Sequence, residues 1–89
     1  MSEEVFEHPS DQIAELVEYL VVSLVDEPDE VAIDITDSDE NTTLIEVSVS
    51  EDDIGKIIGR KGRIIKAIRT LAHACGARKE INCEVEVIG

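Results

Sequence analysis

The residues whose types and spacing best suit ligand binding form one short run, Gly59-Arg60-Lys61-Gly62. Glycine has no Cβ, so a sugar–phosphate backbone can approach the main chain closely at such positions. Arg60 and Lys61 add positive charge, and Gly62 would open a helix whose free N–H groups and dipole favour a phosphate. The run therefore predicts a loop that could accept the phosphates of a polyanionic ligand.

A G-x-x-G pattern alone is weak evidence, because two glycines can also make a simple corner between helices. The surroundings strengthen the prediction, since branched apolar residues flank the loop on both sides and further basic residues follow it. The residues expected to contact nucleic acid are the loop and these neighbours: Lys56, Ile57, Ile58, Gly59, Arg60, Lys61, Gly62, Arg63, Ile64, Lys66 and Arg69.

Charge is strongly segregated along the chain, whose formal net charge is −13. Residues 1–55 contain eighteen acidic residues and no Lys or Arg, whereas residues 56–79 contain all eight basic residues and no acid. Overall charge governs solubility, but a local field decides what docks at a given surface. The basic segment 56–79 therefore remains compatible with a polyanionic ligand.

No other residues assemble a catalytic or metal site. The two histidines, His8 and His73, are far apart, and the two cysteines, Cys75 and Cys83, fit core thiols better than ligands or a disulfide framework. No Ser-His-Asp or Cys-His set and no G-x-x-x-x-G-K-[ST] motif can be formed. We expect no enzyme, no metal and no cofactor.

The length of 89 residues and the 43% hydrophobic content predict one small domain with a single core. No apolar run approaches the roughly 20 residues of a membrane helix. The acidic N-terminal residues lack the basic and apolar regions of a signal peptide. We therefore expect a cytoplasmic protein, with an acidic flexible tail over 1–9 and the folded domain over 10–89.

Hydrophobic periodicity predicts a helix from Ser10 to about Leu24, ended by Pro28. Its apolar stripe comprises Ile13, Leu16, Val17, Leu20, Val21 and Leu24. Alternation predicts a strand over 31–36, and the polar cluster 37–41 predicts a turn. A second strand follows over 42–49, with Thr43, Ile45, Val47 and Val49 on one face.

The second half predicts two helices and a third strand. Ser50 to Asp53 resembles a capping box for a short helix through about Ile58. A longer helix is expected from Arg63 to Cys75, with Gly76 as its stop. Its buried residues are predicted to be Ile64, Ile68, Leu71, Ala72 and Cys75. The last strand is predicted over 81–87.

The resulting order, α-β-β-α-α-β, predicts an α+β fold. The first two strands should form an antiparallel hairpin, and the helical crossover should make the second and third strands parallel neighbours. Residues 42–49 would then lie in the middle of a three-stranded mixed sheet, with three helices packed on one face. We expect an apolar groove between the helices and this middle strand.

The stretch from Ile54 to Arg69 resembles the signature of the KH domain, and the element order matches its prokaryotic, type II form. From about Asp11 to Ile88 the chain resembles the small bacterial single-KH-domain proteins, the KhpA family. This resemblance implies a single-stranded RNA-binding protein and RNA chaperone that acts in post-transcriptional control. It also implies a dimer, either with itself or with a larger KH-containing protein (KhpB), and a link to cell shape.

Two functional hypotheses remain open. The favoured hypothesis is a single-stranded RNA binder whose loop clamps about four nucleotides. The only aromatic residues, Phe6 and Tyr19, lie outside the predicted groove, so we expect weak, salt-sensitive binding by an isolated domain. The alternative is a protein-interaction module whose basic segment 56–79 docks an acidic partner, with RNA binding incidental.

Overall fold

The computed structural model describes residues 9–37 and 41–88. Its α-helices are α1 (Pro9–Leu24), α2 (Ile54–Ile58) and α3 (Arg63–Arg78), and its strands are β1 (Ala32–Asp37), β2 (Thr42–Ser48) and β3 (Asn82–Ile88). Short 3-10 helices precede β1, α2 and α3, namely η1 (Pro28–Glu30), η2 (Glu51–Asp53) and η3 (Arg60–Gly62). The predicted tail lies outside the described residues except for Pro9, at which α1 begins.

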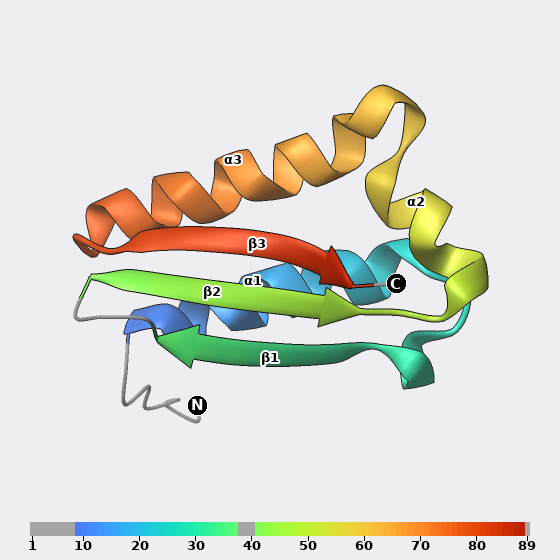
Figure 1. Cartoon of the computed structure of the whole chain (residues 1–89), viewed down its shortest axis with the longest axis horizontal. Helices are drawn as coiled ribbons and strands as arrows, with labels where there is room; N and C mark the ends of the chain where they lie inside the picture. The colour runs from blue at the N-terminus through green and yellow to red at the C-terminus, as the bar shows by residue number, and fades with distance from the viewer. Residues whose placement is uncertain (1–8, 38–40, 89) are drawn as a thin grey trace, which may run out of the picture.

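The three strands form one mixed sheet in the order β1-β2-β3. β1 pairs antiparallel with β2, and β2 pairs parallel with β3, as the hairpin and the helical crossover predicted. The helices gather on one side of this sheet, with α1 behind the strands and α3 running along β3 (Figure 1). The predicted α+β, type II KH-like architecture is therefore confirmed.

The core lies between the sheet and the helices. Every second residue of β2 faces it, so Thr43, Ile45 and Val47 are buried, as the alternation predicted. The helices and β3 contribute the rest of the core: Ile13, Ala14, Val17, Val21, Ile57, Ile65, Ile68, Ala72, Cys83 and Val85. A two-residue period in the strands and a 3.6-residue period in the helices produce this single apolar layer.

Helix α3 differs from the prediction at its end. It does not stop at Gly76 but continues to Arg78. Gly76 is buried against the start of β3, where an added Cβ would lie 2.7 Å from the carbonyl oxygen of Ile81. The glycine therefore allows α3 and the following chain to pack closely. The turn itself uses Glu80, a non-glycine residue at φ 60°.

The buried face of α3 is also rotated relative to the prediction. Leu71 is 46% exposed rather than buried, and Ile64 and Cys75 are half-buried. Ile68 and Ala72 are buried as predicted, and Ile65 and Gly76 complete the buried stripe at helical spacing. Several apolar residues of α3 lie near the boundary between its two faces, so periodicity alone identified the helix but not its rotation. None of the helices in the described ranges is both long enough and apolar enough to cross a membrane.

Candidate nucleic-acid interface

The corner between α2 and α3 is built from unusual backbone conformations. Gly59 ends α2 at φ 75° and ψ 172°, a combination that is essentially confined to glycine. Lys61 and Gly62 then follow in the left-handed region, at φ 57° and 74°. The N–H of Gly62 donates to the carbonyl oxygen of Gly59 at 3.1 Å, which closes the loop on itself.

The two glycines are required for different reasons. A Cβ on Gly59 would lie 2.7 Å from Cγ1 of Ile64, so both the backbone angle and the packing demand glycine there. A Cβ on Gly62 would meet nothing closer than 3.9 Å, and only its left-handed angle favours glycine. The open space at Gly62, which immediately precedes α3, leaves room for a ligand to approach the main chain.

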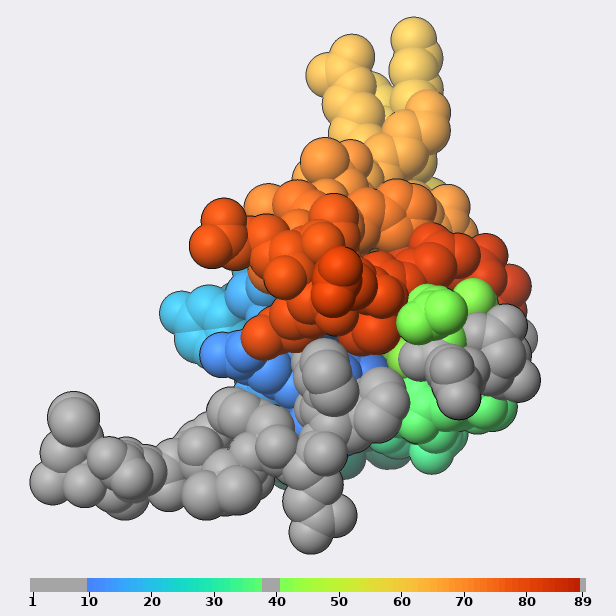
Figure 2. Space-filling model, turned by 90° about the vertical axis from the view of Figure 1, so that its left-hand side faces the viewer, coloured from blue at the N-terminus to red at the C-terminus, as the bar shows by residue number. Residues whose placement is uncertain are grey.

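The predicted basic residues of this loop lie at the surface. Arg60, Lys61, Arg63 and Lys66 are all exposed. Figure 2 shows the segment around residue 60 standing out from the body of the molecule at the top. The N–H of Arg63 donates to the carbonyl oxygen of Arg60, and the next N–H groups of the first turn of α3 have no carbonyl partner within that helix. The corner therefore presents positive charge and backbone donors together.

Lys56 has a different environment from the other predicted contacts. Its Nζ lies 3.2 Å from Oδ2 of Asp26 and 3.4 Å from Oδ1 of Asp53. Because Asp26 lies just after α1, Lys56 connects α2 to the segment that follows α1. Lys56 thereby helps to anchor the loop instead of standing free beside it.

Asp53 is the residue of this region that the sequence analysis missed. The structure shows no side-chain cap from Ser50, contrary to the predicted capping box. Asp53 is instead buried, and its two carboxylate oxygens accept hydrogen bonds from the N–H groups of Asp26 at 3.1 Å and Glu27 at 3.0 Å. These partners lie 27 and 26 residues away, and an acidic run carries no local signal for such a contact.

The ionisation states of Asp53 and Lys56 follow from their contacts. Burial alone would raise the pKa of Asp53, but the N–H groups of Asp26 and Glu27, together with Lys56, lower that pKa below its ordinary value. The hydrogen bond and charge of Asp26, followed by those of Asp53, raise the pKa of Lys56. Both groups are therefore held in their charged forms at neutral pH.

The apolar residues beside the loop differ in burial, and so in what they can contact. Ile57 is fully buried in the core, so it holds α2 in place from below. Ile58 and Ile64 are half-buried and pack against the core from its rim. These two residues leave apolar surface beside the loop, on either side of Gly59.

Arg69 connects α3 to the outer strand of the sheet. Its Nε donates to the carbonyl oxygen of Val85, in β3, at 3.0 Å. β3 is an edge strand, because within the described residues it pairs only with β2. The strand that runs beside α3 is thus β3 and not the middle strand β2, so a groove beside α3 would be bordered by β3 (Figure 1).

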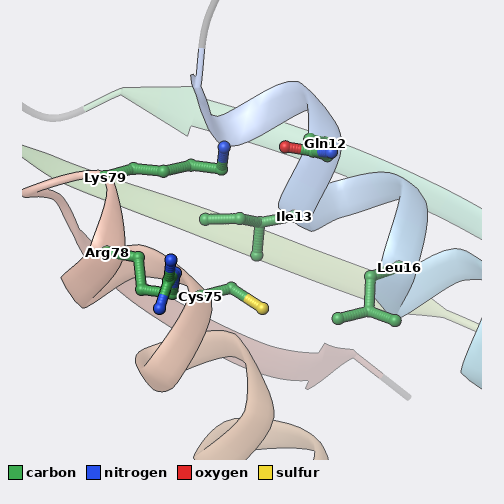
Figure 3. A pocket seen from close by; sticks show the side chains of 6 residues that line it. All are labelled: Gln12, Ile13, Leu16, Cys75, Arg78 and Lys79. Atoms are coloured by element: carbon green, nitrogen blue, oxygen red, sulfur yellow. The ribbon is translucent and has the colours of Figure 1, made fainter.

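The other end of α3 carries a separate cavity of about 360 Å³, between the start of α1 and the end of α3. Figure 3 shows its lining residues: Gln12, Ile13, Leu16, Cys75, Arg78 and Lys79. Its α3 residues Cys75 and Arg78 place this cavity about 18–23 Å along the helix from Arg63, at about 1.5 Å per residue. It is therefore distinct from the α2–α3 corner.

The cysteines do not form a reactive site. Both are free thiols; Cys83 is buried, and Cys75 is half-buried. Burial raises the pKa of Cys83, with a smaller contribution from Cys75, so the neutral thiol dominates at neutral pH. In residues 9–37 and 41–88, no group of three or more His, Cys, Asp or Glu side chains is arranged to hold a metal ion.

Comparison with solved structures supports the fold. The chain aligns with a crystal structure of Aquifex aeolicus Era bound to GDP.AlF4-, with a TM-score of 0.59 and 24% identity over 99% of this chain. It also aligns, at 26% identity and a TM-score of 0.58, with Era in complex with MgGDPNP and nucleotides 1506–1542 of 16S ribosomal RNA. The chain spans about a third of each Era chain, 34% and 35%, so the likeness concerns one part of those proteins.

Sequence comparison identifies the family. The family model "KhpA/KhpB, KH domain" matches residues 14–87. The "RNA-binding protein KhpA" of Borreliella burgdorferi is 47% identical over 74 residues, covering 83% of this chain and 89% of that protein. The protein of the same name from Listeria monocytogenes is 42% identical and is covered to 96%. The chain belongs to the KhpA/KhpB family of KH-domain proteins.

Proposed function

We propose that this protein binds single-stranded RNA through the α2–α3 corner and acts as an RNA chaperone in post-transcriptional control. The observation that carries the proposal is the loop geometry. Two glycines at positive φ bracket exposed Arg60 and Lys61 at the start of a helix with further exposed cations. The relatives named RNA-binding protein KhpA, at 42–47% identity, support the same ligand class.

The strand would bind with its phosphates at this corner and its bases along α3. Backbone N–H groups and the cations at the start of α3 favour phosphate, and Ile58 and Ile64 offer apolar surface to the first bases. Few phosphates can be contacted by so short a loop. We therefore expect modest affinity and a logarithmic salt slope of about −2 for roughly three phosphate contacts.

The test is fluorescence anisotropy of a labelled single-stranded RNA at low salt. The variant Arg60→Asp/Lys61→Asp reverses two charges in the loop, whereas Arg78→Asp/Lys79→Asp makes the same charge change at the far end of α3. Because Arg78 and Lys79 line a cavity with Leu16 and Cys75, the two variants are compared only where light scattering gives both the wild-type mass. We expect the loop variant to lose at least tenfold in affinity and the matched control to lose less than threefold. Circular dichroism verifies folding of each variant.

Equal losses in both variants would contradict a loop-specific site. RNA binding that survives loop reversal would do the same and would favour the alternative, a module whose basic segment 56–79 docks an acidic protein. A strand-annealing assay with complementary RNA hairpins tests the chaperone activity. The wild type should accelerate annealing, and the loop variant should not.

We further propose that the protein works as a dimer in the cytoplasm, with itself or with a larger KH-containing relative. The support is an apolar strip on the outer side of α1 and α3. Leu71 is 46% exposed and Tyr19 is 70% exposed, beside half-buried Leu16 and Cys75. Helical spacing places Tyr19 with Leu16 on α1 and Leu71 with Cys75 on α3, and Leu16 and Cys75 line one cavity (Figure 3).

Dimerisation would raise the effective RNA affinity, because two linked sites act on one strand. Light scattering coupled to size-exclusion chromatography tests it, with and without a KhpB-type partner. Leu71→Glu should produce monomers without unfolding, since the side chain is already partly in water. An unchanged mass for this variant would exclude the strip as the interface. Altered cell shape in a strain that lacks the protein is the expected physiological readout.

A further inference from the structure

The edge of the sheet formed by β1 carries a hollow that lies apart from the α2–α3 corner. Within residues 9–37 and 41–88, β1 pairs only with β2, so its other side is an open edge, and α1 passes behind the sheet (Figure 1). A cavity of about 310 Å³ lies between α1 and β1. Six residues line this α1–β1 hollow: Asp11, Ala14, Glu15, Glu18, Ile33 and Ile35.

The floor of the hollow is apolar and incompletely covered. Ile33 and Ile35 pair with the buried residues Val47 and Ile45 of β2, so they face the same side of the sheet as the core. Ile33 is nevertheless only half-buried, and Ile35 is 39% exposed. The apolar layer of the domain therefore continues beyond α1 to the open edge of the sheet.

The wall formed by α1 is acidic. Asp11, Glu15 and Glu18 recur at helical spacing and line the hollow together. Asp34 adds an exposed carboxylate on the opposite face of β1. An apolar floor beside carboxylates suits a ligand that carries both apolar and positively charged groups, and the same charges repel nucleic acid.

The edge strand also offers backbone groups. Alternate residues of an edge strand direct their N–H and C=O groups away from the sheet, where an extended chain can pair with them. The other edge, β3, is less open, because α3 packs beside it and Arg69 donates to the carbonyl oxygen of Val85. β1 is thus the edge at which a further strand is most readily added.

The chain itself supplies no suitable strand. Its eight Lys and Arg residues all lie within 56–79, a segment that folds as α2, η3 and α3. β1, β2 and β3 contain no Lys or Arg, and residues 1–8 are acidic and contain none either. Pairing of β1 with β1 of a second copy would bring like charges together, which is destabilising. The occupant is therefore a different protein.

We propose that the β1 edge binds an extended, basic segment of a partner protein, which adds as a fourth strand and places side chains in the α1–β1 hollow. Apolar side chains of that segment contact Ile33 and Ile35, and its Lys or Arg side chains reach Glu18 on α1 and Asp34 on the open face. Main-chain hydrogen bonds supply affinity, and the hollow supplies the preference for side chains. This inference does not depend on RNA binding, because it uses a separate surface.

The probe is a fluorescein-labelled nonapeptide, with threonine at the odd positions and valine, lysine, valine and lysine at the even ones. Threonine and valine favour extended structure. A second peptide has glutamate in place of both lysines. In anisotropy titrations, the wild type should bind the lysine peptide at least about tenfold more tightly than the glutamate peptide, because the β1 edge is acidic.

A charge reversal at this edge provides the specific test. Glu18→Lys/Asp34→Lys should lose at least about fivefold in affinity for the lysine peptide and should gain affinity for the glutamate peptide. The matched control, Glu84→Lys/Glu86→Lys, makes the same charge change at the β3 edge, and all four residues are exposed. In about 0.1 M salt, which screens charges more than about 10 Å apart, the control should change either affinity by less than about twofold. Circular dichroism verifies folding of both variants.

Strand addition has its own signature in amide hydrogen exchange. Alternate amides of residues 32–37 exchange rapidly in the free protein, because they face away from β2, and the lysine peptide should protect them. A folded variant that has lost the peptide should lose this protection too.

Three results would overturn the proposal. The first is failure of the wild type to bind the lysine peptide, or equal losses in the two charge variants. The second is peptide binding without new protection in β1. The third is protection of every β1 amide in the peptide-free protein, which would show that the edge is already occupied. The occupant would be a second copy if that protection rises with protein concentration, and residues 1–8 if it does not.

Discussion

The two exposed sides of this small domain carry opposite charges. The α2–α3 corner presents cations and backbone donors, whereas the open face of the sheet presents carboxylates. The strand register places Asp34, Glu46 and Glu86 directly opposite one another across β1, β2 and β3. Like charges in such pairs are destabilising. This pattern therefore does not serve stability, and it sets the carboxylates of the sheet on a different surface from the exposed cations of the α2–α3 corner.

The largest effect is expected from a substitution that disturbs the loop backbone without changing any charge. Gly59→Ala forces a Cβ into a glycine-only conformation and against Ile64. We expect a loss of stability of about 1–3 kcal/mol and at least a tenfold loss of RNA affinity, because the loop must rearrange. Urea denaturation and anisotropy measure the two effects.

The control for this variant is Gly55→Ala, since a Cβ on Gly55 meets nothing within 4 Å. It should be neutral or stabilising, by up to about 1 kcal/mol, because alanine is favoured in a helix. Similar losses in both variants would show that the corner does not depend on its particular backbone angles.

A second substitution tests packing at the far end of α3. Gly76→Ala places a methyl group 2.7 Å from the carbonyl oxygen of Ile81. Because this oxygen belongs to the backbone, it cannot easily move away. Overpacking of this kind costs about 1–3 kcal/mol. Thermal denaturation should show the loss, while RNA affinity measured below the transition should stay within twofold of the wild type. A strong loss of RNA affinity in a folded variant would contradict the separation of the two ends.

The buried carboxylate of Asp53, which pairs with Lys56, gives a pH-dependent prediction. Asp53→Asn removes a carboxylate that accepts two backbone hydrogen bonds and pairs with Lys56, so the melting temperature should fall by several degrees at pH 7. Because the pKa of Asp53 is lowered in the folded state, its stabilisation is present above the unfolded value of about 3.9 and is lost as the pH falls through the folded value.

The difference in melting temperature between wild type and Asp53→Asn should therefore begin to narrow below the unfolded value of about 3.9. It should narrow further as the pH falls through the lowered folded value, where the carboxyl group is protonated in the folded wild type too. A difference that stays constant from pH 7 to pH 3 would show that the stabilising effect of Asp53 depends on the shape of its side chain and not on its charge. Circular dichroism melts across this range provide the measurement.

The smallest expected effect lies on the acidic sheet face. Glu46→Gln removes the central carboxylate of the row between Asp34 and Glu86, and stability should rise by about 0.2–1 kcal/mol. The gain should be larger in low salt than in high salt, because screening weakens repulsion between exposed charges. A destabilised variant in urea titrations would contradict the repulsion inferred from the register.

Most of the fold could be predicted from the sequence, because periodicity reports local structure directly. The alternation in β2 identified its buried residues, and the crossover rule identified the parallel pair. The errors concern contacts between distant segments. Gly76 looked like a helix stop because its packing against Ile81 is not a local property, and Leu71 looked buried because several faces of α3 carry apolar residues.

The candidate site was predictable in composition but not in the roles of its members. The loop glycines and the exposed cations follow from the G-x-x-G pattern. Lys56 was grouped with those cations, yet its two carboxylate neighbours come from the chain after α1 and from Asp53. The edge position of β3 depends on strand order and on the packing of α3 against that strand, and neither is a local property of the sequence.

The most direct test of the central account is a chemical-shift map of the isotopically labelled protein titrated with a single-stranded RNA octamer. The account predicts that the amide shifts cluster over 59–66, along the loop and the start of α3. It also predicts that the open sheet face around Glu46 and the cavity around Cys75 stay unchanged at a one-to-one ratio. Shifts centred on either of those regions, with the loop unaffected, would contradict it.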